Sequence, residues 1–452
     1  MISRHFIDVG ARRVHYRRAG SGPLLLLAHQ SPRSSAEYEP LMLRWGNHFT
    51  CIAPDTPGFG QSDPLPGEPE IDDFGDAMIA FLDALGVDTV AAYGFHSGGI
   101  ILMNAFKRHA ARFTALGCGG YAIWTPAEMA LFGESYLPQF APSAYGEHLT
   151  WLWHRILEQS WFFPWFACDD GHRLSGAHDD PVRVDAVVRE MLDSGAAYRA
   201  GYGAVLRAVR DIPPPAAVTP PVLIAAYDGD PLQSHIDRLG AMPAGWSAMK
   251  VATPGALEDA MLAHLLAFPA SAPAALPEAD DEGFVHIAAG GFDGLVHWRG
   301  ECGRGLIVHA PGESLDLLDG YKLAIDLPGH GLSDPWPDAP ATRAPWAAVL
   351  GAAATALGAH GVLEQPLPRG DPAALFPDLI PDRFGTYLTR AWSIARARVV
   401  FDPWYSSSAA TARAFDPIEL SPARLAVAAR SLLRATAARA YMTALGETDG
   451  NS

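Results

Sequence analysis

The first 270 residues contain two kinds of segment that alternate along the chain. Short continuous apolar runs lie at residues 24–28, 49–54, 89–93, 115–119, 221–226 and 249–252. Segments with helical spacing lie at 36–44, 72–85, 100–110 and 258–268. Strands that are apolar throughout are typical of parallel strands buried on both faces, with helices as the crossovers. The pattern therefore predicts an α/β fold with a doubly wound, mostly parallel sheet.

The strand pattern is interrupted once, by a long segment with helical periodicity. This segment runs from about residue 127 to 210 and is rich in tryptophan. Strand signals resume at Pro221. A sheet that is interrupted by helices and then completed is the layout of a core with a helical cap. We expect a domain over residues 1–270 whose cap covers about 127–210.

The second half of the chain repeats parts of the first. Segments 296–299, 306–309 and 326–334 echo segments 14–17, 26–29 and 55–63. Cap positions recur as well, because Thr389 and Trp404 are separated by the same interval as Thr150 and Trp165. A proline- and alanine-rich linker, with acidic residues at its end, covers 271–282. Residues 283–452 are therefore predicted to form a truncated repeat with its own cap-like helices.

This second copy lacks the parts of the first that carry chemistry. Where the first copy has a strand, a glycine turn and a helix, the second passes through Gln365-Pro366-Leu367-Pro368 without a G-x-x-x-G turn. It also ends shortly after its cap. Four roles remain open for it. It could pack against the first domain, imitate the second subunit of a cap-to-cap dimer, line the active-site entrance, or be a degenerate passenger.

The composition and charge of the chain argue against some classes of binding partner. The 452-residue chain has a formal net charge of -17, which argues against nucleic acid and against an anionic membrane as partner. Four dispersed cysteines form no C-x-x-C pair, so neither a disulfide framework nor a zinc site is indicated. The chain has no apolar signal region and no 18-residue apolar span. We expect a cytoplasmic protein, for which a homodimer is compatible.

The segment Gly94-Phe95-His96-Ser97-Gly98-Gly99 has the spacing of a nucleophile elbow, a sharp strand-to-helix turn. In such a turn the residue midway between the outer glycines is exposed to substrate. Counting from Gly94 to Gly98 places His96 at that apex. Counting from Ser97 instead places bulky Phe95 where the turn requires a small residue.

Further motifs surround this segment in a recognisable order. His29-Gln30-Ser31-Pro32 follows an apolar strand, Asp55-Thr56-Pro57-Gly58-Phe59-Gly60-Gln61-Ser62-Asp63 follows the next, and Tyr227-Asp228-Gly229-Asp230-Pro231 follows a later one. Together these motifs resemble those of the α/β-hydrolase superfamily with a helical cap. The resemblance implies that backbone N–H groups near Gln30, Ser31 and Ser97 form an oxyanion hole, with His29 in the same loop. It also implies that Asp230 is the acid of the site.

The histidine that such a site usually holds after its last strand is missing. The chain reads Thr253-Pro254-Gly255-Ala256-Leu257-Glu258-Asp259 there. The nearest histidine, His264, lies in a helical run and is interpreted as a packing or surface residue. A catalytic triad needs a nucleophile, an imidazole and a carboxylate, so the imidazole is absent from its usual place and present at the apex.

Three hypotheses follow for the chemistry. In the first, His96 is a general base or nucleophile and Asp230 orients it. In the second, Ser97 is the nucleophile and an imidazole comes from His96 or from the cap histidines, His172 and His178. In the third, the site is inactive and the protein binds or scaffolds. A minor variant takes the missing imidazole from the second copy, whose histidines are His286, His297, His309, His330 and His360.

The cap indicates the class of substrate. Seven aromatic residues crowd into 151–166, and most of them must anchor the cap to the core. Trp124, Trp153 and Trp165 are the candidates for contact with a small apolar or aromatic molecule. No phosphate-binding or metal-binding motif is present, so we expect chemistry without a cofactor or metal. The predicted activity is hydrolysis of a small ester, lactone or related carbonyl compound, with a lyase or cyclase as the alternative.

Overall fold

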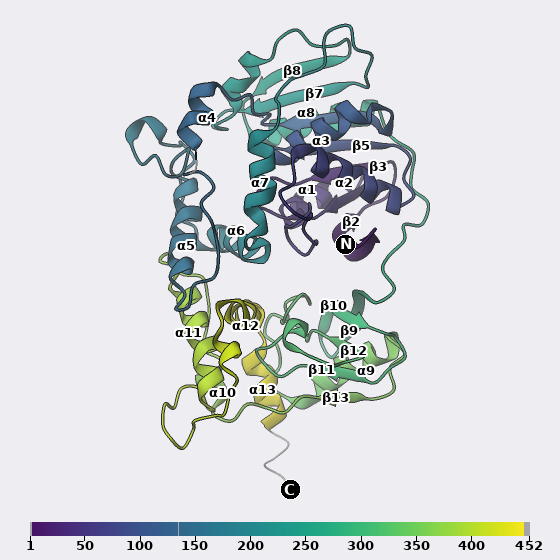
Figure 1. Cartoon of the computed structure of the whole chain (residues 1–452). Coiled ribbons are helices and arrows are strands. Elements are labelled where there is room, and N and C mark those ends of the chain that lie inside the picture. Colours follow the sequence, from purple (N-terminus) through teal and green to yellow (C-terminus); the bar gives the residue numbers. More distant parts are fainter. Residues whose placement is uncertain (1, 134, 447–452) are drawn as a thin grey trace. The chain divides into compact units, whose positions relative to one another are not determined.

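The computed structural model describes residues 2–133 and 135–446 and divides into two compact units (Figure 1). Unit 1 comprises Met1–Ala141 and His154–Glu278, and unit 2 comprises Pro142–Trp153 and Ala279–Ser452. The division places the first half of one cap helix in unit 2.

In the described part of unit 1, eight strands form one sheet in the order β1-β2-β4-β3-β5-β6-β7-β8. The strands are β1 (Ile2–Val9), β2 (Arg12–Ala19), β3 (Leu24–Ala28), β4 (Thr50–Pro54), β5 (Val90–Phe95), β6 (Phe113–Gly119), β7 (Val222–Tyr227) and β8 (Trp246–Val251). β1 and β2 are antiparallel to their neighbours, and β3 to β8 are parallel. The mostly parallel sheet is confirmed, and the β1–β2 hairpin is an addition that the apolar runs did not indicate.

Both faces of this sheet are buried, as the continuous apolar runs predict. Helices α1 (Glu39–Trp45) and α8 (Pro254–Ala267) pack on one face, and α2 (Ile71–Ala84) and α3 (Ser97–Arg108) on the other. In β3, Leu25 and Leu27 join the core cluster that includes α1 and α8, whereas Leu24 and Leu26 join the cluster that includes α2 and α3. Successive strand side chains point to opposite faces, so a strand between two helical layers must be apolar at every position.

The described residues between β6 and β7 include four helices, which form the cap. They are α4 (Pro126–Phe132), α5 (Glu147–Gln159), α6 (Pro181–Ser194) and α7 (Ala197–Arg207). Figure 1 shows α4, α6 and α7 together on one side of the unit 1 strands. Thr125 and Asp180 accept backbone N–H groups at the starts of α4 and α6, which satisfies donors that a helix N-terminus leaves free. Short 3-10 helices occur at Ser35–Tyr38, Ala110–Arg112, Asp170–His172 and Gln233–Arg238.

Unit 2 has a smaller sheet with the order β13-β11-β12-β10-β9. Its strands are β9 (Glu282–Ala289), β10 (Phe292–Gly300), β11 (Leu306–Val308), β12 (Leu323–Ile325) and β13 (Val362–Glu364). Its helices are α9 (Arg343–Ala356), α10 (Pro372–Leu375), α11 (Thr386–Val400), α12 (Pro422–Arg434) and α13 (Ala438–Gly446), with 3-10 helices at Leu315–Leu317 and Pro417–Leu420. The strand order corresponds to β5-β3-β4-β2-β1 of unit 1.

The loop after β13 differs from its counterpart in unit 1. The sequence predicted that the second copy lacks both the strand and the turn, but the strand is present as β13, paired in parallel with β11. The prediction missed it because Val362–Glu364 is short and exposed at its first two positions. Residues 365–368 then lead toward the four-residue helix α10 instead of into a turn and a long helix.

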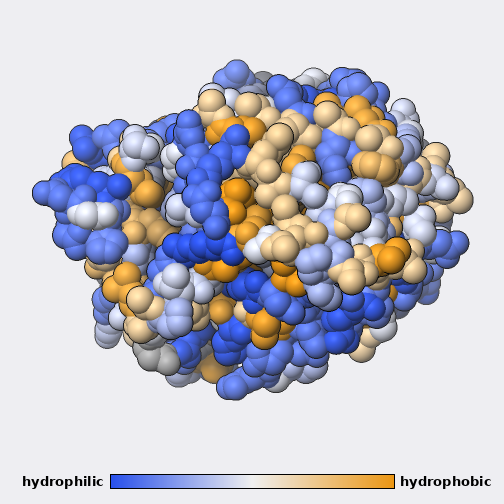
Figure 2. Space-filling view, turned by 90° about the horizontal axis from the view of Figure 1, so that it is seen from above, coloured by the Kyte–Doolittle hydropathy of each residue, from blue (hydrophilic) through white to orange (hydrophobic). Residues whose placement is uncertain are grey.

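Among the described residues, no helix combines the length and apolarity that crossing a bilayer requires. Figure 2 shows one face of the molecule, where hydrophilic residues surround separate apolar patches.

Two tryptophans that the predicted repeat aligns make reciprocal contacts within unit 2. Trp153 donates its indole N–H to the carbonyl of Arg383 at 3.3 Å, and Trp392 donates to the carbonyl of Ala144 at 3.4 Å. A Cβ on Gly385 would lie 2.4 Å from the Trp153 ring, and one on Gly146 would lie 2.9 Å from the Trp392 ring. These paired contacts have the self-complementary form of a two-fold interface.

We expect Trp153→Ala and Trp392→Ala to destabilise unit 2 by similar amounts. Both rings are almost fully buried, at 1% and 2% exposure, and removing such a ring costs about 3 to 5 kcal/mol. Denaturant unfolding measures the change, with exposed Ser393→Ala on α11 as the control. A loss below about 1 kcal/mol for either variant would contradict the reciprocal packing.

His15 of β2 and His297 of β10, which the predicted repeat aligns, lie in different electrostatic surroundings. His15 bonds Asp55 at 2.9 Å, and its burial lowers its pKa more than that carboxylate raises it. His297 bonds Asp326 at 2.8 Å and Glu282 at 3.1 Å. Burial would also lower the pKa of His297, but the two carboxylates outweigh burial and raise it.

Glu282→Gln should therefore lower the pKa of His297 and leave that of His15 unchanged, as NMR titration of the imidazole signals will measure. With its folded pKa raised, His297 contributes stability that is fully present below the unfolded pKa of about 6.5. This contribution is lost as the pH rises through the folded value, so the variant should lose stability mainly in acid. An unchanged His297 titration would contradict this account.

Candidate active site

His96 lies at the apex of the turn between β5 and α3. Its backbone has φ 48° and ψ -115°, a conformation that is rare and costly for a residue other than glycine. The turn brings the start of α3 against the end of β3, because a Cβ on Gly98 would lie 1.9 Å from the carbonyl oxygen of Ala28. These features are those of a strand-to-helix elbow with an imidazole at its apex.

The imidazole of His96 is paired with Asp230, which follows β7. The Nε2 atom lies 3.1 Å and 3.2 Å from the two carboxylate oxygens of Asp230. The Asp230 side chain is fully buried, and 24% of the His96 side chain is exposed. Burial would raise the pKa of Asp230, but the charge of His96 and its hydrogen bond lower it below its usual value. Asp230 is therefore the anionic acceptor of this bond.

This bond determines which nitrogen of His96 can react. Because Nε2 donates to a carboxylate, the neutral ring carries its lone pair on Nδ1. Among the residues that the structure describes, none forms a hydrogen bond with Nδ1. The ring also stacks on Phe95, with 4.0 Å between ring centroids, which restricts its rotation.

Ser97 is buried and follows the apex. Its Oγ accepts the backbone N–H of Ser31 at 2.5 Å. Among the described residues no imidazole bonds Ser97, so the base that a serine nucleophile requires is not beside it. The structure thus brings His96, Asp230, Ser97 and Ser31 to one edge of the sheet.

His29 is used within its own loop. Its Nδ1 lies 2.9 Å from the carbonyl oxygen of Gln30, and its Nε2 accepts the backbone N–H of Thr56 at 2.9 Å. Both ring nitrogens are therefore engaged in joining the loops after β3 and β4. Gln30 is fixed as well, because its side-chain amide donates to Glu37 at 2.5 Å.

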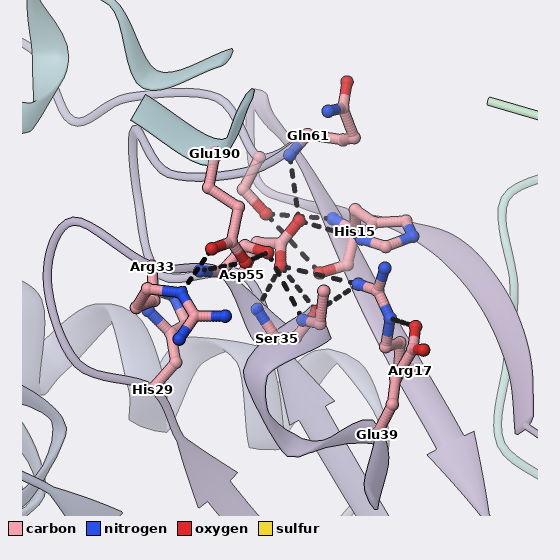
Figure 3. A network of polar contacts seen from close by, with 12 residues as sticks. His15, Arg17, His29, Arg33, Ser35, Glu39, Asp55, Gln61 and Glu190 are labelled. Carbon is pink, nitrogen blue, oxygen red and sulfur yellow. Dashed lines mark hydrogen bonds and ion pairs between the residues drawn. The ribbon is translucent and has the colours of Figure 1, made fainter. Parts of the chain in front are cut away.

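A buried carboxylate, Asp55, holds the loop after β3 in place (Figure 3). It accepts hydrogen bonds from the backbone N–H of Ser35 at 2.8 Å, from that of Gln61 at 2.8 Å, and from the His15 ring at 2.9 Å. Beside it, Arg33 forms an ion pair with Glu190 of the cap. The conformation of the Gln30–Ser31 segment thus depends on contacts from three elements.

A cavity of about 170 Å³ lies between this loop and the cap. Its walls are formed by Gln30, Ser31, Pro32 and Arg33 on one side and by residues of α5, α6 and the segment between them on the other: Ile156, Gln159, Ser160, His178, Arg183, Val184 and Val187. The cavity thus reaches Ser31, whose N–H contacts Ser97. Gln159 and Arg183 were not predicted, because helical periodicity does not reveal which polar residues face a cavity.

The predicted cap residues have different surroundings. The Trp124 ring packs on Phe132 at 4.8 Å and on His235 at 4.9 Å, and the indole N–H of Trp165 donates to the carbonyl of Tyr136 at 3.3 Å. Trp153 belongs to unit 2, where its ring packs as described above. Of the cap histidines, His178 lines the cavity, and His172 bonds Asp169 at 2.8 Å on the surface.

His235 is a buried histidine near the site that the sequence did not indicate. Its Nδ1 accepts the backbone N–H of Ile123 at 2.9 Å, and its burial together with the charge of Arg238 lowers its pKa to about 4. It is therefore neutral at pH 7 and stabilises the loop after β6. Its position five residues after Asp230 is the one signal that could have drawn attention to it.

The position after the last strand contains no histidine. Helix α8 begins at Pro254, directly after β8, and the Thr253 side chain accepts the N–H of Ala256 at 3.1 Å. His264 lies on α8 and packs on Phe268 at 5.7 Å between ring centroids.

Comparisons with known proteins agree with this fold. A family model described as "alpha/beta hydrolase fold" matches residues 23–118. The chain is 28% identical over 228 residues to haloalkane dehalogenase 2 of Mycobacterium tuberculosis, covering 49% of this chain and 76% of that protein. It is also 39% identical over 89 residues to 2-(acetamidomethylene)succinate hydrolase of Mesorhizobium japonicum, covering 19% and 32%.

Solved structures include the enol-lactonase from Burkholderia xenovorans LB400, with 18% identity, coverage of 57% of this chain and 99% of that one, and a TM-score of 0.43. An epoxide hydrolase from Vigna radiata has 18% identity, coverage of 57% and 95%, and a TM-score of 0.45. The resemblance to the α/β-hydrolase superfamily, which the motifs indicated, is confirmed. The relative from Mesorhizobium japonicum is a hydrolase by its name.

Gly120 leaves the space that the His96–Asp230 pair occupies. A Cβ at this position would lie 2.6 Å from Nε2 of His96 and 2.7 Å from Oδ2 of Asp230. We expect Gly120→Ala to break this pair, so that ¹⁵N NMR of His96 changes from one tautomer, protonated at Nε2, to a mixture of both.

Gly195→Ala is the matched control, because Gly195 has a similar positive φ, 52° against 58°, with no atom within 4 Å of its Cβ position. Both variants carry the same backbone strain of about 1 kcal/mol. An unchanged His96 tautomer in Gly120→Ala would contradict the geometry of the pair.

Proposed function

We propose that this protein is a hydrolase that acts on a small ester, lactone or related carbonyl compound and uses His96 as a general base. The observation that carries the proposal is the imidazole at the elbow apex, paired with a buried carboxylate through Nε2 and open at Nδ1. Oriented in this way, a neutral imidazole is an effective base near neutral pH.

In the first step, Nδ1 of His96 removes a proton from a water molecule as the water oxygen attacks the carbonyl carbon. The π electrons of the C=O bond move to the carbonyl oxygen and form a tetrahedral oxyanion. Asp230 stabilises the imidazolium by charge and by its hydrogen bond, and it does not take the proton.

The oxyanion needs donors, and the loops around the apex offer them. Ser97 is the first residue of α3, so its backbone N–H belongs to the group that a helix start leaves unpaired. The Ser97 hydroxyl already accepts the Ser31 N–H, so its own proton is available for a second acceptor. We assign these two donors to the oxyanion, with Ser31 holding the hydroxyl in position.

In the second step, the oxyanion collapses to a carbonyl and the bond to the leaving oxygen breaks. The imidazolium returns its proton to that oxygen, so an acid and an alcohol leave and His96 is neutral again. No covalent enzyme intermediate is required, which agrees with the lack of a base beside Ser97.

The test is the turnover of a panel of aryl esters and lactones by the full chain. We expect His96→Ala to lower kcat/KM by at least 1,000-fold, Asp230→Asn by about 100-fold or more, and Ser97→Ala by about 10- to 100-fold through the lost donor. His264→Ala, a histidine on α8, is the control and should retain wild-type activity.

Two results would contradict the proposal. One is labelling of Ser97 by a serine-directed phosphonate together with complete loss of activity in Ser97→Ala, which would make Ser97 the nucleophile. The other is inertness toward every ester and lactone, with His96-dependent exchange of solvent deuterium into a carbonyl compound, which would favour a lyase or cyclase.

A further inference from the structure

Arg155 of α5 is a buried cation without a buried anion beside it. Its side chain is among the most buried in the chain, at 2% exposure. Its Nη1 donates to Oε1 of Gln159 at 2.5 Å, and its Nε and Nη2 have no hydrogen-bond partner in the described part of the chain. No carboxylate there forms an ion pair with it. The guanidinium lies over the Trp165 ring, 5.4 Å from the ring centroid, and its one hydrogen bond to a described residue is the one to Gln159.

Gln159 connects Arg155 with the cavity, because it bonds Arg155 and also lines the cavity wall. Because its Oε1 is occupied by Arg155, its amide N–H₂ group is left without an intramolecular acceptor among the described residues. Gln159 is also part of the cavity wall. The side chain therefore presents donors, and no acceptor, to whatever occupies the cavity.

Two more donors line the same wall. His178 has a buried Nδ1 without a hydrogen-bond partner, and the guanidinium of Arg183 forms no ion pair with any residue that the structure describes. The neighbouring carboxylate of Asp180 is engaged, since it accepts the N–H groups of Val182 and Arg183 at the start of α6. Asp179 and Asp180 adjoin His178 in the chain, so this wall carries carboxylates as well as the Arg183 guanidinium, which is exposed to solvent.

The donors of the opposite wall are already engaged. Arg33 is paired with Glu190, and the Gln30 amide is bonded to Glu37. The space between the walls is bordered by apolar side chains of the cap, namely Ile156, Val184 and Val187. The cavity therefore combines an apolar middle with a cluster of unpaired donors on one side.

We infer that Gln159, His178 and Arg183 bind a carboxylate of the substrate, so that the substrate is a small carbonyl compound with an apolar body and one anionic end. This inference rests on the proposed function, which determines where the carbonyl end of the substrate must lie. Ser31 lines the cavity and its N–H bonds Ser97, the neighbour of His96, so the carbonyl group of the substrate is assigned to the Ser31 side and its carboxylate to the cap wall. A carboxylate matches these donors because it accepts hydrogen bonds at both oxygens and carries charge opposite to Arg183.

Binding can be measured apart from turnover by using His96→Ala in the full chain, with benzoate and benzamide as probes. The two probes share size and shape and differ in charge. We expect calorimetry to show benzoate binding at least 5-fold more tightly than benzamide. Arg183→Met should remove this preference, and Gln159→Leu should reduce it. Arg173→Met, at an exposed cap arginine paired with Asp170, should leave it unchanged.

The second measurement compares the turnover of two substrates. One is an aryl half-ester of a dicarboxylic acid, which carries a free carboxylate, and the other is the corresponding methyl diester, which does not. For the half-ester, Arg183→Met should raise KM about 10-fold and leave kcat nearly unchanged. For the diester, the substitution should change neither KM nor kcat. Equal binding of benzoate and benzamide, or a benzoate affinity that is the same in Arg183→Met, would overturn the inference.

The two proposals can fail separately. Arg183-dependent benzoate binding without any ester turnover would contradict the proposed function and support the anion site. Turnover of both esters with equal KM values would support the proposed function and contradict the anion site. If both the binding preference and the turnover are absent, both proposals are wrong.

Discussion

The sharp turn between β5 and α3 is the constraint on which the site depends. It requires a close approach of the α3 start to the end of β3, and it holds one side chain at the carboxyl edge of a sheet that is rigid because both faces are buried. In this chain that side chain is an imidazole. Its partner, Asp230, reaches it from the end of β7 through a gap that only a glycine at position 120 leaves open.

The strands, the apex residue and its carboxylate partner were predicted from local sequence patterns. The six apolar runs correspond to β3 through β8, and the glycine spacing identified His96 as the apex, because a tight turn permits few residue types at fixed positions. Asp230 was predicted from its loop motif, and the two side chains are within hydrogen-bond distance. These features depend on contacts between neighbours in sequence or on a fixed order of strands.

Features that depend on contacts between distant segments could not be predicted in the same way. The pairing of Ser31 with Ser97 and the orientation of Gln159 by Arg155 join side chains whose roles depend on how loops and cap meet. Trp153 looked like a candidate for ligand contact because it belongs to an aromatic cluster. Composition cannot distinguish a ring that faces a cavity from one that, like Trp153, packs on another helix.

The strand order of unit 2 matches that of β1 to β5 in unit 1, and its described residues hold no counterpart of the turn after β5. β13 pairs with β11 as β5 pairs with β3, but the residues after β13 form neither an elbow nor a long helix. Unit 2 instead contributes packing, including the reciprocal contacts of Trp153 and Trp392. Catalysis in this account is confined to unit 1, with one imidazole that both accepts and returns the proton.

The most direct test of that central claim is to follow acylation of individual histidines by diethyl pyrocarbonate with mass spectrometry while activity is recorded. Because Nδ1 of His96 is open and its lone pair is held there by Asp230, we predict that His96 reacts among the fastest histidines and that activity falls in proportion to its modification. Activity that persists after His96 is fully modified, or that is lost while His96 is intact, would contradict the account.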